Sequence, residues 1–126
     1  KVFSNVVESK LLAKRNGRCL VRMKIGHPVL SVTYHVEMTP DESSWTMKFH
    51  QVSGMANDLD DIYGYWRLFP VAENRTIVAY ALNVQVPMGL VNLLPAPFKR
   101  MAITSLLGVP GYLREWMDKQ PRREKP

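Results

Sequence analysis

Residues 63–80 read YGYWRLFPVAENRTIVAY. Two apolar, aromatic-rich runs flank a short polar break, and an arginine lies among the rings. Alternation with a period of two indicates paired strands, because neighbouring side chains of a strand point to opposite faces. The stretch leaves three interpretations open: ordinary core, a stacking platform for nucleic-acid bases, or the wall of a ligand cavity.

The same alternation runs through the first two thirds of the chain. Residues 2–13 are predicted to form a strand, and Asn16-Gly17 is a strong signal for a two-residue hairpin turn. Polar or glycine- and proline-rich breaks separate the further alternating runs, at residues 26–28, 39–44, 54–60 and 72–75. The pattern predicts six strands joined by short connections, which is an antiparallel meander.

After Pro87 the period changes to that of a helix. One stripe recurs at three- and four-residue spacing, formed by Phe98, Met101, Ala102, Ser105, Val109, Leu113 and Trp116. The helix is predicted to begin near Pro97 and to kink between residues 108 and 111, where glycine and proline cluster. A helix of about 22 residues spans roughly 33 Å, which is too little to cover six long strands. A missing segment, another chain or a ligand is therefore expected to fill the remaining space.

Composition limits the class of protein. With 126 residues, 46% of them hydrophobic and 22% charged, the chain is predicted to form one soluble domain over residues 1–120, followed by a basic disordered tail at 121–126. No stretch approaches the roughly 18 consecutive apolar residues that cross a bilayer. The single cysteine, Cys19, excludes an internal disulfide and a cysteine-based zinc cluster. The compartment is not determined, with the cytoplasm slightly favoured.

No motif indicates a metal ion, a cofactor or a catalytic nucleophile. His27, His35 and His50 show no metal-ligand spacing, and each is expected at the surface. The acidic run at 57–61 lacks the glycine and glutamate of a calcium-binding loop and is interpreted as a solvated hairpin tip. Phosphate loops, nucleophile elbows and zinc-binding histidine pairs are absent from the sequence. We therefore expect no metal and no cofactor.

Arg67 lies between Trp66 and Leu68 and so projects from the opposite face of its strand. It is interpreted either as a solvent-facing residue whose stem covers Tyr65 or Phe69, or as a pocket residue that orients a ligand carboxylate or phosphate. The first interpretation is favoured, because Gly64, Trp66 and Leu68 are the better candidates for the side of the strand that faces the core.

The aromatic residues fall into two groups. Tyr65 and Phe69 share a face with Arg67 and fit a base-stacking platform, which needs exposed rings beside basic residues. The others fall on the faces richest in Val, Leu and Met, and are predicted to be core or cavity wall: Trp45, Phe49, Trp66 and Tyr80.

The pattern Gly64-x-Trp66-x-Leu68-x-Pro70, a short turn, then Thr76-x-Val78-x-Tyr80 resembles the START-like, or SRPBCC, superfamily. That group includes lipid-transfer START domains, polyketide cyclase/dehydrase-like proteins and coenzyme Q-binding proteins. Pro87, with Leu94-Pro95, also resembles the family's crossover from strand to helix. The resemblance covers nearly all of residues 3–118 and consists mostly of packing positions. It implies an α+β helix-grip fold, in which a curved antiparallel sheet of about six strands packs on a long, kinked C-terminal helix, with an apolar cavity between them.

The same resemblance suggests that the N-terminal part of the domain is incomplete. Family members usually begin with one more strand and two short helices, and Phe3–Leu12 resembles their second strand. An open sheet edge would then invite pairing with another chain, so a homo-oligomer is a possible state.

The helix is too short to cover the apolar face of the sheet. Together with the resemblance, this predicts a non-catalytic module that binds a hydrophobic small molecule such as a lipid, quinone or polyketide. The residues expected to contact this ligand are Val21, Met23, Val32, Tyr34, Val36, Met47, Phe49, Trp66, Arg67, Leu68, Val78, Tyr80, Leu82, Met101 and Ser105. One alternative is a polyketide cyclase or dehydratase, in which Tyr34, Tyr80 and Arg67 are the candidates for acid or base. Another is a ribosome- or RNA-associated protein, which the net charge of +6 permits. Nucleic acid is the less expected partner.

Overall fold

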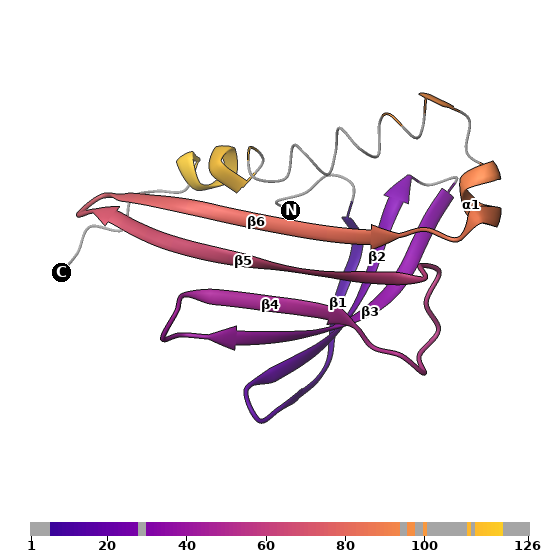
Figure 1. The fold of residues 1–126 in the computed structure, drawn as a ribbon, viewed down its shortest axis with the longest axis horizontal. Coiled ribbons are helices and arrows are strands. Elements are labelled where there is room, and N and C mark those ends of the chain that lie inside the picture. Colours follow the sequence, from indigo (N-terminus) through magenta and orange to yellow (C-terminus); the bar gives the residue numbers. More distant parts are fainter. Residues whose placement is uncertain are drawn as a thin grey trace.

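The computed structural model describes residues 6–27, 30–93, 96–97, 100, 111 and 113–119. Its main feature is one six-stranded antiparallel sheet in which the strands follow one another in chain order (Figure 1). The strands are β1 (Val6–Arg15), β2 (Arg18–His27), β3 (Leu30–Asp41), β4 (Thr46–Gln51), β5 (Asp61–Ala72) and β6 (Arg75–Gln85), and a short helix, α1 (Met88–Leu93), follows. The predicted meander is confirmed.

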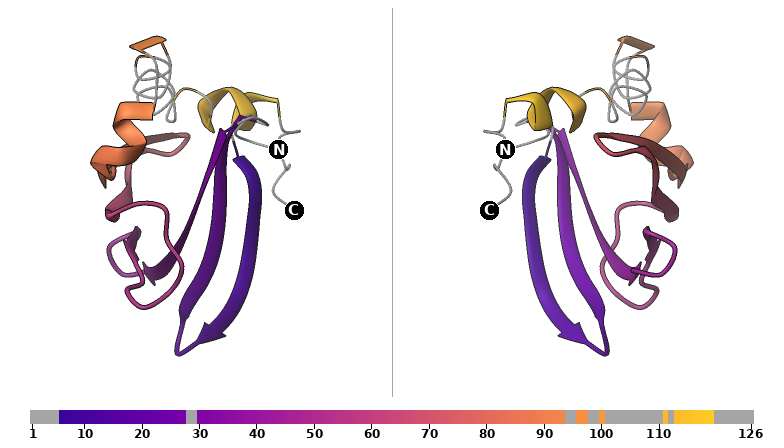
Figure 2. Two further views of the ribbon diagram at one scale, coloured as in Figure 1. Left: turned by 90° about the vertical axis from the view of Figure 1, so that its right-hand side faces the viewer. Right: turned by 90° about the vertical axis from the view of Figure 1, so that its left-hand side faces the viewer.

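The sheet is strongly bent. Figure 2 shows it as a trough, with β1 and β2 in one wall and β5 and β6 in the other. Residues 113–118 are helical and lie on the open side of the trough. Of the predicted helical stripe, Phe98, Met101, Ala102, Ser105 and Val109 lie outside the described residues, so the long, kinked helix stays a prediction.

Helix α1 was not predicted from the sequence. It has only six residues, which is too few to show a helical period. Pro87 precedes it, and the Pro87 carbonyl accepts hydrogen bonds from the N–H groups of Leu90 (2.9 Å) and Val91 (3.1 Å). A proline at a helix start is a known signal, and it marks the change from strand to helix here. None of the helices in the described part of the chain is long and apolar enough to span a bilayer.

The first and last hairpins have the turns that the sequence predicts. Asn16 and Gly17 both adopt positive φ, at 52° and 74°, as a two-residue turn between twisted strands requires. At the other end, Ala72 pairs with Arg75 across another two-residue turn.

The β3–β4 turn differs from the prediction at Trp45. This residue was expected on a strand, facing the core, but it lies in the turn with φ at 51° and is 61% exposed. The cause is Asp41, whose carboxylate accepts hydrogen bonds from Ser43 and Ser44 and so prolongs the turn. Pairing with β3 therefore begins only at Thr46.

The strand register divides the side chains between two faces. One face carries the core, in which Val21, Tyr34, Val36, Leu59 and Ile62 are buried. Partly buried residues from β2 through β6 pack against this one cluster, among them Met23 and Leu82. In a flat sheet, residues on β2 and β6 would be about 19 Å apart. Their packing around one cluster shows that this apolar face is the concave one.

The connection between β4 and β5 forms hydrogen bonds with the part of β3 that does not pair with β4. The Val52 N–H donates to the carbonyl of His35 (2.9 Å), and the Asp58 N–H donates to that of Thr33 (2.8 Å). In return, the Thr33 N–H donates to Asp58 Oδ2 and the His35 N–H donates to Asn57 Oδ1, each at 2.7 Å. Asn57 and Asp58 thus satisfy an exposed strand edge. Asp58 is exposed, as predicted for this loop, and Asn57 is half-buried. Their hydrogen bonds to β3 were not predicted.

His35 was predicted at the surface, and this prediction is wrong. The residue does project from the polar face of β3, but it is only 7% exposed, and its Nδ1 lies 3.4 Å from Asn57 Oδ1. Asn57 is distant in the sequence, so the alternation within β3 carries no signal for this contact. His50 is exposed, as predicted, whereas the side chain of His27 lies outside the described part of the structure.

Candidate functional site

The concave face collects most of the residues predicted to contact a ligand. Cross-strand pairs such as Met23–Tyr34, Met47–Trp66 and Gly64–Leu82 set the register across the sheet. By this register the residues on the concave face are Val21, Met23, Val32, Tyr34, Val36, Met47, Phe49, Trp66, Leu68, Val78, Tyr80 and Leu82. Met101 and Ser105 lie outside the described residues.

A groove opens at the end of this face where the β3–β4 turn meets β5. Its volume is about 240 Å³, and its lining residues are Pro40, Asp41, Glu42, Trp45, Thr46, Met47, Trp66 and Leu68. This is just below the roughly 300–1,000 Å³ of typical small-molecule pockets, so the groove suits one ring or one end of a ligand. Of the predicted set, only Met47, Trp66 and Leu68 line it. Trp45, predicted as core or cavity wall, lines the groove from the turn and not from a strand. Pro40, at the end of β3, was not among the predicted ligand contacts.

The carboxylate of Asp41 at the rim of the groove is held by hydrogen bonds within its own turn. Asp41 Oδ1 accepts hydrogen bonds from the Ser43 N–H (3.0 Å) and Oγ–H (2.6 Å), and Oδ2 accepts one from Ser44 Oγ–H (2.8 Å). These hydrogen bonds favour the charged carboxylate and lower the pKa of Asp41. The carboxylate therefore stabilises the turn and is not available as a proton donor at neutral pH.

Trp66 joins the groove to the rest of the concave face. Its ring centroid lies 4.3 Å from that of Tyr80, the direct cross-strand partner, with an angle of 37° between the planes. Aromatic pairs in this range contribute about 0.5–1.5 kcal/mol beyond the area that they bury. The contact fixes the Tyr80 ring beside the groove wall.

Tyr34 and Tyr80 are the phenols of the concave face. Tyr34 is 7% exposed, and no hydrogen bond joins either hydroxyl group to a residue that the structure describes. Burial raises the pKa of Tyr34 to about 12, and the nearby Tyr80 contributes to the rise. Burial also raises the pKa of Tyr80. Both groups are therefore protonated at neutral pH, and the bend of the sheet brings them within electrostatic range of each other.

No protein-family model matches the chain, and no curated protein sequence matches it significantly. Its structure is similar to TTHA0849 from Thermus thermophilus, with a TM-score of 0.67 and 19% identity, covering 94% of this chain and 81% of that one. It is also similar to the Zhui aromatase/cyclase from Streptomyces sp. R1128, with a TM-score of 0.63 and 18% identity, covering 87% and 74% of the two chains.

This chain has an α+β, helix-grip-like fold. The α+β class and the curved sheet agree with the sequence prediction. Because both identities are below 20%, the similarity shows the fold only. The ligand and the activity of this chain have to be inferred from its own residues.

Alkaline pH is expected to destabilise the helix-grip-like sheet through Tyr34. Its pKa is about 12 in the folded protein and about 10 in an unfolded chain, so between these values only the unfolded state loses the proton. The stabilising contribution is fully present below about pH 10 and is lost as the pH rises to about 12. By the size of the shift, this loss is about 2–3 kcal/mol.

The measurement is urea unfolding at several pH values from about 9 to 11.5. We expect the free energy of unfolding to fall less steeply with pH in Tyr34→Phe, because phenylalanine has no proton to lose. Tyr65→Phe is the matched control, since Tyr65 is exposed on the convex face. Parallel curves for wild type and Tyr34→Phe would contradict the assignment.

Arg67 is not part of the concave face. It pairs with Ala79 on the convex side of β5, and its guanidinium carbon lies 4.7 Å from the centroid of the Phe69 ring. The solvent-facing alternative is therefore the one that the structure shows, and Arg67 does not share a face with the other predicted ligand contacts. The physical reason is the strict alternation of β5, which places Trp66 and Leu68 inward.

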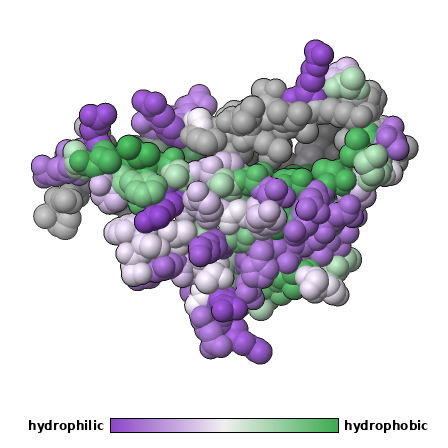
Figure 3. Space-filling view, in the orientation of Figure 1, coloured by the Kyte–Doolittle hydropathy of each residue, from purple (hydrophilic) through white to green (hydrophobic). Residues whose placement is uncertain are grey.

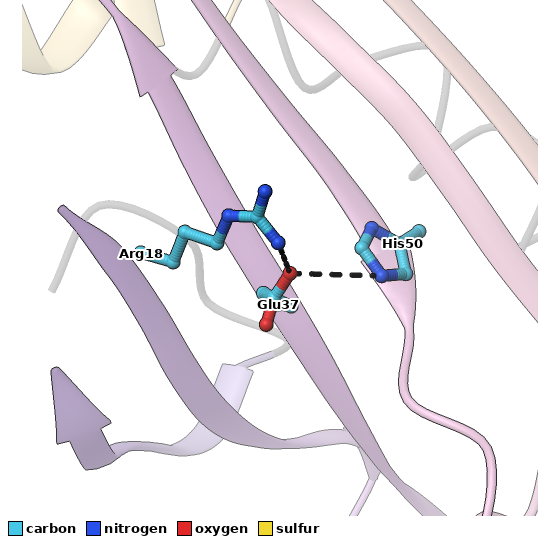
Figure 4. A network of polar contacts seen from close by, with 3 residues as sticks. All are labelled: Arg18, Glu37 and His50. Atoms are coloured by element: carbon cyan, nitrogen blue, oxygen red, sulfur yellow. Dashed lines mark hydrogen bonds and ion pairs between the residues drawn. The ribbon is translucent and has the colours of Figure 1, made fainter. Parts of the chain in front are cut away.

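The convex face also carries a cluster of charged residues. Glu37 Oε1 lies 3.2 Å from Arg18 Nη1 and 3.9 Å from His50 Nε2, so the three side chains meet across β2, β3 and β4 (Figure 4). Exposed ion pairs of this kind contribute about 0–1 kcal/mol each. None of the three lines the groove. We interpret them as cross-strand contacts that stabilise the register.

Hydrophobic residues are also exposed along the β5–β6 hairpin. Figure 3 shows them gathered over these two strands, above a more hydrophilic region. The exposed residues of the hairpin include Tyr65, Leu68, Phe69, Val71 and Ile77. Since β6 is an edge of the sheet, pairing of this edge with another chain stays a hypothesis.

Proposed function

We propose that the concave face binds a hydrophobic small molecule, of lipid, quinone or polyketide-like character. The observation that carries this proposal is the groove beside Trp66, which is bounded by Met47, Leu68 and Pro40. Apolar walls next to a tilted aromatic pair suit a flat or chain-like ligand. Binding would come mainly from burial of apolar surface, reduced by the cost of association.

The comparisons support a ligand-binding role without fixing the ligand. One of the similar structures is an aromatase/cyclase. Folds of this kind host several functions, so the role of this chain has to be argued from its own site.

A cyclase-type enzyme is the second candidate, because the structure brings Tyr34 and Tyr80 onto the same face within electrostatic range. With their raised pKa values, both phenols would act as hydrogen-bond donors or acids, not as bases, at neutral pH. Turnover of a polyketide substrate that falls in Tyr34→Phe or Tyr80→Phe would support this candidate. Turnover that is unchanged in both would remove it.

The test of the binding role starts with the protein as purified from cells. Organic-solvent extraction followed by mass spectrometry is expected to reveal a bound lipophile. In parallel, a fatty acid, a short-chain quinone and a flat aromatic ketone are each titrated by calorimetry and thermal unfolding. A ligand present at 100 times its Kd should stabilise the protein by about 2.7 kcal/mol. Absence of any extracted or bindable lipophile would contradict the proposal.

A further inference from the structure

We propose that the hydroxyl groups of Tyr34 and Tyr80 are the polar end of the binding site and select neutral ligands that carry a carbonyl oxygen. The inference rests on the proposed function, since it names the ligand class for the same concave face.

The first observation is the environment of Tyr34. The residue lies on β3 and belongs to the buried core cluster, together with Val21, Val36 and Ile62. A buried tyrosine hydroxyl normally has a hydrogen-bond partner. Among the described residues, Tyr34 has none. In the described part of the chain the Tyr34 hydroxyl is therefore a donor without a protein partner, and we assign a ligand acceptor to it.

Tyr80 provides the second donor and the link to the groove. Its ring packs against that of Trp66 with the centroids 4.3 Å apart and the planes tilted by 37°, and Trp66 forms part of the groove wall. The Tyr80 hydroxyl likewise has no hydrogen bond to a described residue. A ligand ring that contacts Trp66 would thus lie next to the Tyr80 ring.

The two phenols are complementary to a carbonyl group. Each is a donor when protonated, and a carbonyl oxygen can accept a hydrogen bond from either of them. Both hydroxyl groups are protonated at neutral pH, as tyrosine normally is, and burial raises their pKa values further.

A carboxylate is less well matched to this site. None of the residues that line the groove is a lysine or arginine that could pair with an anion, and Arg67 projects from the other face of β5. Asp41 and Glu42 line the groove and would repel negative charge. These charges favour a ketone, quinone or ester carbonyl over a free acid.

The experiment compares fluorenone with fluorene, which share one three-ring frame and differ in the ketone oxygen. Affinities are measured by calorimetry for wild type, Tyr34→Phe, Tyr80→Phe and the convex-face control Tyr65→Phe. A hydrogen bond of ordinary strength corresponds to about a 2- to 12-fold preference. We expect the fluorenone-to-fluorene affinity ratio to fall by such a factor in each concave-face variant and to stay at the wild-type value in Tyr65→Phe.

The outcomes separate this inference from the proposed function. If both probes bind and the ratio is the same in all four proteins, carbonyl selection is overturned while the binding function stands. Preferential binding of decanoate over fluorenone would overturn it as well. If no probe and no lipophile of the wider panel binds, the proposed function fails, and the inference fails with it. Tyr-to-Phe changes keep the ring in place, and thermal unfolding checks that each variant is folded.

Discussion

Replacing Gly64 with alanine is expected to lower the free energy of unfolding by about 3 kcal/mol. A Cβ atom at this position would lie against the backbone carbonyl of Ala81 on β6 and 2.7 Å from the ring of Phe49 on β4. The Phe49 ring can rotate, but the Ala81 carbonyl belongs to the strand paired with β5 and cannot move without disturbing the register. Alanine is disfavoured at this position by lack of space for its Cβ atom and not by the backbone conformation, because Gly64 does not have a positive φ.

The measurement is urea unfolding of Gly64→Ala beside Gly89→Ala. Gly89 lies in α1 with open space around its Cα, so alanine there should raise stability by about 0.5–1 kcal/mol. The two glycine-to-alanine changes are thus expected to have opposite signs. A loss below about 1 kcal/mol at Gly64 would show that β5 and β6 can separate there at little cost, contrary to the close packing described above.

Replacing Trp66 with alanine is expected to weaken fluorenone binding about 30-fold, which corresponds to about 2 kcal/mol. The change removes part of the groove wall and the ring against which Tyr80 is held. Buried aromatic residues at the centre of a site usually contribute most of the binding free energy. The affinity is measured by calorimetry, at a temperature where circular dichroism shows the variant to be folded.

The matched control for Trp66→Ala is Tyr65→Ala. Tyr65 is the adjacent aromatic residue on the same strand, but it projects from the convex face and is 41% exposed. Its removal should change the affinity by less than about twofold. Equal losses in the two variants would indicate a general effect on β5, and an unchanged affinity in Trp66→Ala would place the ligand elsewhere.

The sheet could be predicted from the sequence because its signals are local. Alternation sets which residues share a face, so Trp66 and Leu68 were correctly assigned to the opposite side from Arg67. The Asn16-Gly17 turn follows from the ability of these two residues to adopt positive φ. These signals need no knowledge of distant residues.

The features that could not be predicted depend on contacts that the alternation within a strand does not encode, some of them local and some between distant segments. His35 is buried because Asn57 lies against it from a later loop. Trp45 leaves the strand because the Asp41 carboxylate prolongs the turn. The approach of Tyr34 to Tyr80 follows from the bend of the whole sheet, which alternation within single strands does not encode. The candidate site was thus predicted as a face of the sheet but not as a groove.

The order of the strands has a consequence for how the sheet forms. Every strand pairs only with the strand that precedes or follows it in the chain. Each pairing therefore closes a short loop, and the entropy lost in closing a loop grows with its length. Chains dominated by such local pairings fold faster than chains of similar size whose strands pair across long connections. We expect this sheet to assemble hairpin by hairpin, because each strand can pair with a neighbour in the chain before the distant strands have folded.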